Sequence, residues 1–357
     1  MIPRSGGIDP ASFAPRLVAW QRACGRHDLP WQRSRDPYCV WVSEIMLQQT
    51  RVDTVLRYFE PFVRRFPGVR ELAAADLDQV LAQWSGLGYY RRARNLHAGA
   101  RQVCEVHGGQ LPSSRAELET IRGIGRSTAA AIAVFCFDLP EAILDANVQR
   151  VLGRAFGLPQ PATAAARRDM WRLAEQLLPR QDLAAYTQGL MDLGATVCKP
   201  AQPECLLCPF AADCPRELAP PPTAPARRRA PRRSLTRVLL WARSGPAQAP
   251  RVWLQRRAGH GIWPGLWCLP EHDDQAGALA QAGELGELLR QQELPAVVHP
   301  LTHVELRLHP LQVVLRPRHR VTDGALDGGW FALDEALRLG LPAPVRKLLT
   351  AAPAAGD

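Results

Sequence analysis

The chain has 357 residues, with 44 Lys and Arg against 34 Asp and Glu, a formal charge of +10 and a pI near 9.6. This length predicts two domains of ordinary size, and the positive charge favours a polyanionic partner, nucleic acid first. No apolar run approaches the ~18 residues of a membrane span and no signal-peptide core opens the chain, so we expect a cytoplasmic protein without a membrane partner.

The first strong helix signal runs from Pro37 to about Gln49, with Asp36 as its N-cap. Glu44 is the one charged residue between positions 38 and 47. A carboxyl group among apolar side chains loses hydration, which raises its pKa toward the range of a general acid. The alternative is a buried glutamate paired with an arginine for structural reasons.

A second helix is expected to begin at a capping box formed by Thr50 and Asp53. Gln48 and Gln49 then lie at the junction of the two helices. From the residues alone, this junction is either a DNA-facing site or a polar corner with no further role.

Glycines, tyrosines and arginines are interleaved in residues 84–96, where Gly86 and Gly88 precede Tyr89 and Arg91. Aromatic rings beside arginines suit base stacking together with phosphate contact. A solvated basic helix end with tyrosines packed below it is the alternative.

A helical hairpin is predicted further along the chain. Ser113 or Ser114 caps a first helix that carries Leu118 and Ile121, and the alanine-rich run 128–135 forms a second helix. Close packing of two helices is the expected outcome.

Gly123 and Gly125 make the turn of this hairpin. Backbone N–H groups at such a turn favour a DNA phosphate, although a tight turn with no ligand fits the same pattern. Asp145 is placed as the N-cap of a third helix, and capping alone would explain it. The apolar positions of that helix are Val148, Val151, Leu152 and Phe156.

Helices are expected from about 164 to 193, followed by Cys198, Cys205, Cys208 and Cys214. Four thiolates within so short a loop can close around one metal centre. On ligand type alone, zinc and an iron–sulfur cluster both remain open.

A Pro- and Arg-rich linker, residues 216–234, separates these helices from a second domain of mixed α and β structure. A helix is expected in that domain around 278–291. The expected strand regions are 235–242, 251–257, 297–315 and 328–333.

The glycine hairpin, the later aspartate and the four cysteines together resemble the endonuclease III superfamily of helix-hairpin-helix DNA glycosylases, and within it the MutY family. The likeness spans position 29 to about position 349. It implies an all-α glycosylase domain, residues 1–215, with an iron–sulfur cluster loop at 198–214. An α+β Nudix-like lesion-recognition domain, residues 235–357, would follow the linker.

The resemblance implies base excision repair, in which adenine mispaired with 8-oxoguanine or guanine is removed by hydrolysis of its N-glycosidic bond. Glu44 would protonate the leaving base, Asp145 would stabilise the sugar cation or bond to it, and Asn147 would help to position that centre. One [4Fe-4S] cluster would be held by the four cysteines. The implied partner is double-stranded DNA with an A:8-oxoguanine or A:G mispair, bound by a monomer at the bacterial nucleoid.

The resemblance also assigns DNA contacts. Tyr89 would be the wedge beside the oxidised guanine, Arg91 would support the backbone, and Trp31 of the Leu-Pro-Trp motif would line the adenine pocket. Gln49 would enter the duplex near the opposite base. The full set of implied DNA-binding residues is Gln48, Gln49, Tyr89, Arg91, Gly123, Gly125 and Ser127.

Three positions depart from the pattern of the superfamily. Ser127 stands where bifunctional members carry a Schiff-base lysine, which implies a monofunctional enzyme without efficient strand cleavage. Arg122 replaces the usual proline before the hairpin glycines. Leu301 replaces the aromatic residue of a lesion-reading motif, whose other members here are Thr302 and His303. An ordinary loop histidine is the alternative for His303.

Nucleotide hydrolysis by the second domain is not expected, because Glu284 and Glu287 are scattered where a Nudix enzyme clusters its magnesium-binding glutamates. Two other classes stay open for the whole chain. They are a glycosylase specific for thymine or uracil, and a DNA-binding scaffold without an active site.

Overall fold

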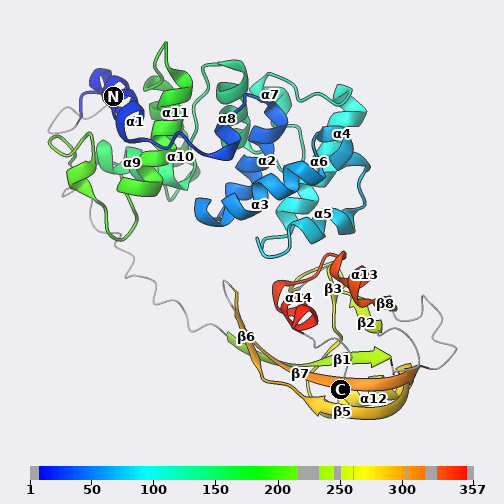
Figure 1. The fold of residues 1–357 in the computed structure, drawn as a ribbon. Helices are drawn as coiled ribbons and strands as arrows, with labels where there is room; N and C mark the ends of the chain where they lie inside the picture. Colours follow the sequence, from blue (N-terminus) through cyan, green and yellow to red (C-terminus); the bar gives the residue numbers. More distant parts are fainter. Residues whose placement is uncertain are drawn as a thin grey trace. The chain divides into compact units, whose positions relative to one another are not determined.

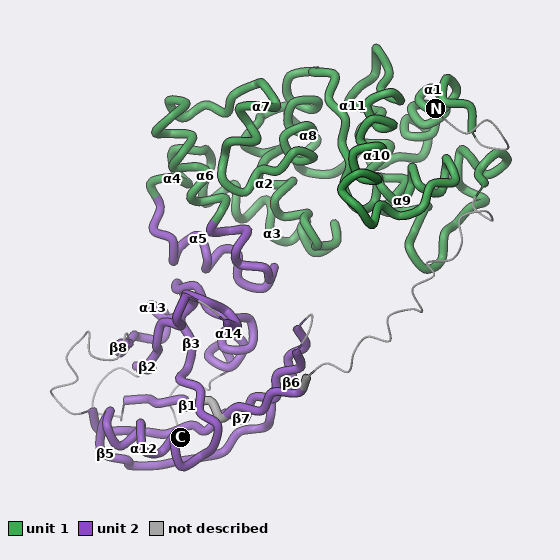
Figure 2. Tube along the Cα trace, turned by 180° about the vertical axis from the view of Figure 1, so that it is seen from behind, with its two compact units in different colours: residues 1–74, 95–224 green, residues 75–94, 225–357 purple. Residues whose placement is uncertain are grey.

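The computed structural model describes residues 8–215, 233–244, 251–259, 261–301, 304–317 and 328–351. It divides into two compact units, the first formed by Met1–Ala74 and Asn95–Ala224 and the second by Ala75–Arg94 and Pro225–Asp357 (Figure 2). Each unit has its own core and is described separately. In these ranges, no helix is long and apolar enough to cross a membrane.

The described part of the first unit is helical (Figure 1), which confirms the fold class predicted for the N-terminal domain. Helix α6 (Arg91–His107) runs into it from the second unit. The other elements are α1 (Pro10–Cys24), η1 (Pro30–Gln32), α2 (Pro37–Leu47), α3 (Val52–Arg65), α4 (Val69–Ala74), α7 (Arg115–Leu118), α8 (Arg126–Phe137), α9 (Ala146–Ala155), α10 (Ala164–Gln176), α11 (Leu183–Asp192), η2 (Leu193–Val197) and η3 (Cys205–Leu207).

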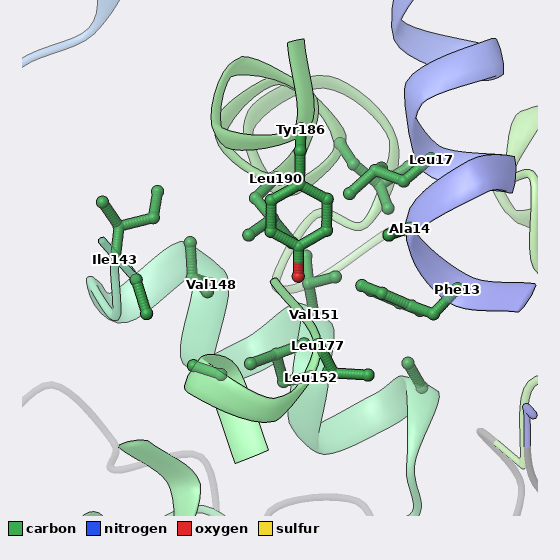
Figure 3. Close-up of a cluster of buried hydrophobic side chains, with 14 of the residues drawn as sticks. Phe13, Ala14, Leu17, Ile143, Val148, Val151, Leu152, Leu177, Tyr186 and Leu190 are labelled. Atoms are coloured by element: carbon green, nitrogen blue, oxygen red, sulfur yellow. The ribbon is translucent and has the colours of Figure 1, made fainter. Parts of the chain in front are cut away.

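A large apolar cluster joins α1, α9 and α11 in the first unit. Figure 3 shows the ring of Tyr186 pointing from α11 into the side chains of α1 and α9. Val148 and Leu152 of α9 are fully buried there. Burying one such side chain contributes about 1.5–3 kcal/mol, so this contact fixes α9, the helix that begins at Asp145.

Several predicted helix starts are confirmed. The Asp36 carboxylate accepts a hydrogen bond from the Tyr38 N–H (3.0 Å), and the Ser114 hydroxyl accepts one from the Glu117 N–H (3.3 Å). The capping box expected at Thr50 and Asp53 is wrong, since α3 begins at Val52 with no side-chain cap. The Thr50 hydroxyl instead donates to the Gln48 carbonyl (3.5 Å), so it is not aimed at the first turn of α3.

The hairpin has the predicted turn but a shorter first helix. Helix α7 ends at Leu118, and Ile121 lies in the turn, although its side chain is buried as expected. Gly123 has a φ of 92°, a left-handed conformation that favours glycine. Helix α8 then contains the whole alanine-rich run, which confirms the second helix.

The described part of the second unit is α+β, as predicted for the C-terminal domain. Its strands are β1 (Arg233–Ser244), β2 (Arg251–Arg256), β3 (Trp267–Cys268), β4 (Glu271–His272), β5 (Gly286–Glu293), β6 (Val297–Pro300), β7 (Val304–Pro317) and β8 (Gly328–Ala332). They form one sheet with the central order β3-β2-β1-β7-β5, in which β4 also pairs with β1, β6 with β7 and β8 with β2. Strands β1 and β7 are parallel, and the other pairs are antiparallel.

The helices of the second unit are α5 (Leu77–Gln83), α12 (Gln275–Leu285), α13 (Leu333–Leu337) and α14 (Ala343–Thr350). Helix α12 packs on the sheet, where its Ala278, Ala282 and Leu285 join a buried cluster with Leu311 and Val313 of β7. The sheet and α12 therefore share one core.

The helix expected over 278–291 is wrong in its second half, because 286–293 is strand β5. Gly286 ends α12 with an extended backbone. A Cβ there would lie 2.5 Å from the Arg316 carbonyl oxygen, so the close approach of β5 to β7 requires glycine at this position. Pairing with β7 supplies the backbone hydrogen bonds that a longer helix would have made.

The division of the chain by contacts places residues 75–94 with the C-terminal residues. The sequence assigned 75–94 to the catalytic domain and set the domain limits at 1–215, 216–234 and 235–357. Those limits remain a prediction.

Candidate active site and cysteine loop

Glu44 lies on α2, whose apolar side chains are almost all buried. Burial first, and then the charge of Asp145, raise the pKa of Glu44 to about 8. In the described part of the chain, no side chain forms an ion pair or hydrogen bond with its carboxyl group, so the alternative of a structural arginine pair is not found. At neutral pH this carboxyl is therefore mostly protonated and able to donate a proton.

Asp145 is the N-cap of α9, and its carboxylate accepts a hydrogen bond from the Val148 N–H at 2.7 Å. Burial raises the pKa of Asp145, while hydrogen bonds from the backbone of Val148 and Asn147 and the charge of Arg150 act in the opposite direction. The capping role is thus real. It also gives this carboxylate a polar environment that Glu44 lacks.

Two neighbouring carboxyl groups in different environments are suited to different tasks. Burial raises the pKa of both groups, but only Asp145 also accepts backbone hydrogen bonds, which favour its anion. One can act as an acid while the other stabilises positive charge.

The hairpin is connected to this carboxylate through Ser127. The Ser127 hydroxyl, in the first turn of α8, accepts a hydrogen bond from the Leu144 N–H at 3.1 Å. Gly123 and Gly125 are exposed at the start of α8, where the first N–H groups of a helix have no intrahelical acceptor. One hydrogen bond therefore joins the first turn of α8, which is suited to an anion, to Leu144, the residue before Asp145.

Helix α9 also connects Asp145 to the cysteine loop through Arg150. The guanidinium of Arg150 donates to the Asn147 side-chain oxygen (2.7 Å), to the Gly194 carbonyl (2.6 Å) and to the Cys198 carbonyl (2.7 Å). One arginine therefore holds the predicted positioning residue Asn147 and the first cysteine together. Its spacing alone, two residues after Val148, gave no sign of this role.

One turn later on α9, Arg154 lines the loop itself. Its guanidinium lies 3.4 Å from the Cys198 sulfur and donates to the Lys199 and Pro200 carbonyls, and the Cys214 thiol contacts its carbonyl oxygen at 3.4 Å. The ring of Phe210, between the third and fourth cysteines, stacks on Phe13 of the core at 4.6 Å. The loop is thus anchored by a helix and by an aromatic pair.

The donor set of the loop fits an iron–sulfur cluster or another thiolate centre. Cys198, Cys205, Cys208 and Cys214 are all free and partly exposed. Burial raises the pKa of Cys208 to about 11, and the other three cysteines of the loop act in the same direction. The four side chains are therefore near enough to interact electrostatically. They are not drawn together as closely as metal ligands, and over the described ranges no group of three or more His, Cys, Asp or Glu side chains is.

Besides Gly123, two of the residues predicted to contact DNA have left-handed backbones. Gln49, beyond the end of α2, has a φ of 58°, and Tyr89, in the second unit, has a φ of 50° and a 46% exposed side chain. Strained, exposed conformations of this kind concentrate at functional sites. Gln48 ends α2 as its C-cap, and Arg91 is exposed at the start of α6.

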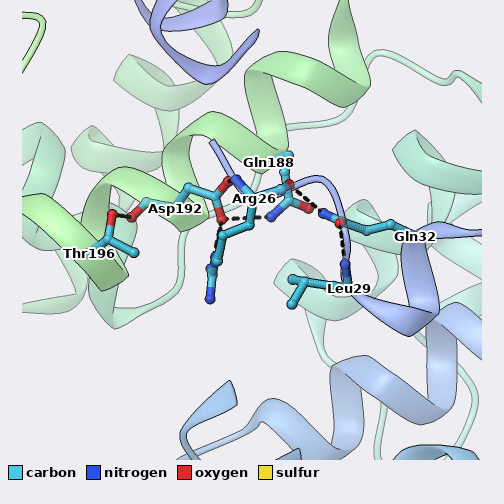
Figure 4. Close-up of polar contacts among 6 residues, drawn as sticks. All are labelled: Arg26, Leu29, Gln32, Gln188, Asp192 and Thr196. Atoms are coloured by element: carbon cyan, nitrogen blue, oxygen red, sulfur yellow. Dashed lines mark hydrogen bonds and ion pairs between the residues drawn. The ribbon is translucent and has the colours of Figure 1, made fainter. Parts of the chain in front are cut away.

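A buried polar network that the sequence analysis missed supports the Leu-Pro-Trp segment (Figure 4). Asp192, 1% exposed, accepts hydrogen bonds from the backbone and side chain of Arg26 (2.8 and 2.7 Å) and from the side chain of Gln188 (2.8 Å). The Gln32 side chain joins the Arg26 carbonyl to the Leu29 N–H, each at 3.1 Å. A lone aspartate within an apolar helical stretch was the signal that could have revealed this network.

Trp31 lies in the short helix η1, directly before Gln32 of this network. The Trp31 side chain is 7% exposed and packs edge-on against Phe59 at 5.4 Å between ring centroids. Its place in an adenine pocket remains a prediction. The predicted lesion-reading residues Thr302 and His303 lie outside the described residues.

Comparison with known proteins agrees with this fold. Residues 42–176 match the family described as HhH-GPD superfamily base excision DNA repair protein, and residues 246–351 match the NUDIX domain family. In solved structures, a thermostable thymine-DNA glycosylase superposes with a TM-score of 0.53 at 27% identity, covering 58% of this chain and 95% of that one. The helical part is thus that of a base excision DNA repair glycosylase.

Relatives that match nearly the whole of this chain show which family of glycosylases it belongs to. The adenine DNA glycosylase of Buchnera aphidicola subsp. Schizaphis graminum is 31% identical over 346 residues, which cover 94% of this chain and 97% of the relative. The Homo sapiens adenine DNA glycosylase is 31% identical over 388 residues, covering 91% of this chain and 71% of the relative. The chain belongs to the adenine DNA glycosylase family.

Proposed function

We propose that this protein removes adenine from A:8-oxoguanine and A:G mispairs in double-stranded DNA by hydrolysing the N-glycosidic bond, without efficient strand cleavage. The observation that carries the proposal is the pair formed by Glu44, with its pKa raised to about 8, and the hydrogen-bonded Asp145. Membership of the adenine DNA glycosylase family supports adenine as the base.

The two carboxyl groups have different roles in the reaction. Glu44 protonates the flipped adenine at N7, so that a neutral base leaves, and afterwards takes a proton from the attacking water. Asp145 stabilises the positive charge that develops on the sugar, or bonds to it transiently. Asn147, held by Arg150, positions this centre.

The backbone N–H groups at Gly123 and Gly125 bind a DNA phosphate. The exposed guanidinium of Arg91 contacts the DNA backbone at another point. Gln48 and Gln49 contact the duplex near the orphaned base, and Tyr89 enters beside the oxidised guanine. Trp31 lines the adenine pocket. The left-handed, exposed backbones at Gln49 and Tyr89 support these two assignments.

Monofunctional chemistry is proposed from Ser127. A Schiff base requires an amine, and a hydroxyl that accepts the Leu144 N–H offers none. Strand breaks should therefore appear only after alkali.

The second domain is proposed to read 8-oxoguanine through Thr302 and His303, and not to hydrolyse nucleotides. Glu284 is exposed on α12, and Glu287 on β5 pairs with Arg316 at 2.7 Å, so these two glutamates are not gathered for magnesium.

The four cysteines are proposed to hold one [4Fe-4S] cluster, which would fix the fold of residues 198–214 and take part in no step of the hydrolysis. Arg150 and Arg154 would keep that loop attached to α9. Purified protein with stoichiometric iron and sulfide is expected, and stoichiometric zinc without iron would contradict this assignment.

The proposal is tested by single-turnover assays on duplexes in which A lies opposite 8-oxoguanine, G or T, with and without alkali. We expect adenine release from the first two, and strand breaks only after alkali. Thymine and uracil opposite G serve as matched duplexes, since the helical domain also resembles a thymine-DNA glycosylase. Release of those bases in place of adenine would replace the proposal.

A further inference from the structure

The loop that carries Tyr89 is held at both ends by one backbone carbonyl of the C-terminal residues. The Ser85 hydroxyl donates to the Leu341 carbonyl oxygen at 2.8 Å, and the Tyr90 hydroxyl donates to the same oxygen at 3.2 Å. Both residues belong to the same compact unit as Leu341. Only residues 86–89 lie between the two bonds, so the loop is closed on that carbonyl.

Arg346 on α14 joins Ser85 to the segment that leads to Leu341. Its Nε donates to the Ser85 hydroxyl at 3.0 Å, and its two terminal nitrogens donate to the Leu337 and Leu339 carbonyls at 2.8 and 3.1 Å. Ser85 therefore accepts from a guanidinium and donates to a carbonyl. A hydroxyl with both bonds formed has one orientation.

Inside the loop, three residues have left-handed backbone conformations. Gly86, Gly88 and Tyr89 have φ values of 107°, 72° and 50°. The Trp84 indole donates to the Gly88 carbonyl at 3.1 Å, and the Arg92 guanidinium lies over the Tyr89 ring at 5.4 Å. The left-handed backbone at Tyr89 is strained for a residue other than glycine, and it persists only where the surroundings impose it.

Residues 75–94 also pack closely against the C-terminal residues at other points. The Trp267 indole on β3 donates to the Asp78 carboxylate at 3.1 Å, and a Cβ added at Gly340 would lie 2.6 Å from the Leu81 Cβ on α5. Two β-carbons attached directly to backbone cannot approach so closely, so residues 75–94 and the C-terminal residues meet where no side chain fits.

We propose that Ser85, Tyr90 and Arg346 are positioning residues through which the C-terminal part of the chain sets the conformation of the Tyr89 wedge. The inference rests on the proposed role of Tyr89 in DNA. It gives the C-terminal residues a second task besides lesion contact: they hold the exposed wedge in the strained backbone that points it at DNA.

The test is a double-mutant cycle on the full, cluster-loaded chain. Affinity is measured for a duplex with 8-oxoguanine opposite a stable abasic analogue, which binds whether or not the protein excises adenine. The variant with Ser85→Ala and Tyr90→Phe should bind this duplex about tenfold more weakly, since it lacks both hydrogen bonds to the Leu341 carbonyl and the one from Arg346 to Ser85. In a Tyr89→Ala background the same pair of substitutions should change affinity by less than about twofold.

Two variants act as controls, and a third perturbs the same contact in another way. Tyr58→Phe removes a tyrosine hydroxyl elsewhere and should bind as the wild type does. Ser85→Thr keeps the hydroxyl and should restore most of the affinity lost in Ser85→Ala. Gly340→Ala leaves both hydroxyls in place but separates the two surfaces, and should weaken binding by a similar factor, again only when Tyr89 is present.

An equal loss of affinity with and without Tyr89 would show a general effect on folding and overturn the proposal, as would no loss in either background. The proposed function is tested separately, by measuring adenine release from the wild type. A wild-type protein that excises adenine but shows no coupling contradicts this inference alone.

Discussion

Replacing Glu44 by Gln should both abolish adenine release and change how stability depends on pH. The ordinary pKa of this side chain is 4.5, and the folded protein raises it to about 8. Between these values the folded protein binds a proton that the unfolded chain has lost. The stabilisation is complete below pH 4.5 and is lost as the pH rises through 8.

At 1.36 kcal/mol for each pKa unit, the wild type should lose about 4 kcal/mol of unfolding free energy between pH 5 and pH 9 through this one group. Glutamine fills the same space and cannot ionise, so the variant should not show that part of the loss. The difference between the two proteins should therefore widen with pH and favour the variant at pH 9.

The assay is thermal or urea unfolding of both proteins at several pH values, with adenine release measured on the same samples. Excision by the wild type should decline as the pH rises past about 8, where Glu44 loses its proton. Parallel stability curves for the two proteins, or excision retained by the variant, would refute the reasoning about this carboxyl group.

The other predictions separate roles that one residue combines. Asp145→Asn keeps a capping oxygen without the charge, so adenine release should vanish while stability changes by less than about 1 kcal/mol; retained release would leave Asp145 a cap alone. Arg150→Leu removes three hydrogen bonds to the cysteine loop and its surroundings, and should cost roughly 2–4 kcal/mol and lower the iron content; unchanged iron would separate α9 from the loop. Gly123→Ala puts a methyl group 2.8 Å from the Asn95 Cβ at a φ of 92°, and should cost about 1–3 kcal/mol in unfolding experiments, whereas Gly125→Ala meets open space and serves as the stability control.

Features determined by a few neighbouring residues could be predicted from the sequence. Asp36 and Asp145 cap helices as expected, because a cap needs only a side-chain oxygen and the N–H groups that follow it. The raised pKa of Glu44 was expected for a similar reason, since its neighbours in the sequence of α2 are apolar and most of them are buried. Thr50 shows the limit, because α3 begins one residue later than a cap at Thr50 requires and has no side-chain cap.

Features set by distant residues could not be predicted. Strand β5 was taken for helix because its sequence has no alternation, and only its pairing with β7 makes it extended. The contacts of Arg150 with the cysteine loop, of Asp192 with Arg26 and of Ser85 with Leu341 join residues from 48 to 256 positions apart. Side chains of these types occur throughout the chain, so nothing in their own neighbourhood distinguished them.

The central claim is that Glu44 and Asp145 together cut the bond between adenine and its sugar. The most direct test identifies the base released from a duplex with A opposite 8-oxoguanine by the wild-type protein and by a folded Asp145→Asn variant. We expect free adenine from the wild type and none from the variant. No adenine from the wild type, or equal amounts from both proteins, would contradict the account.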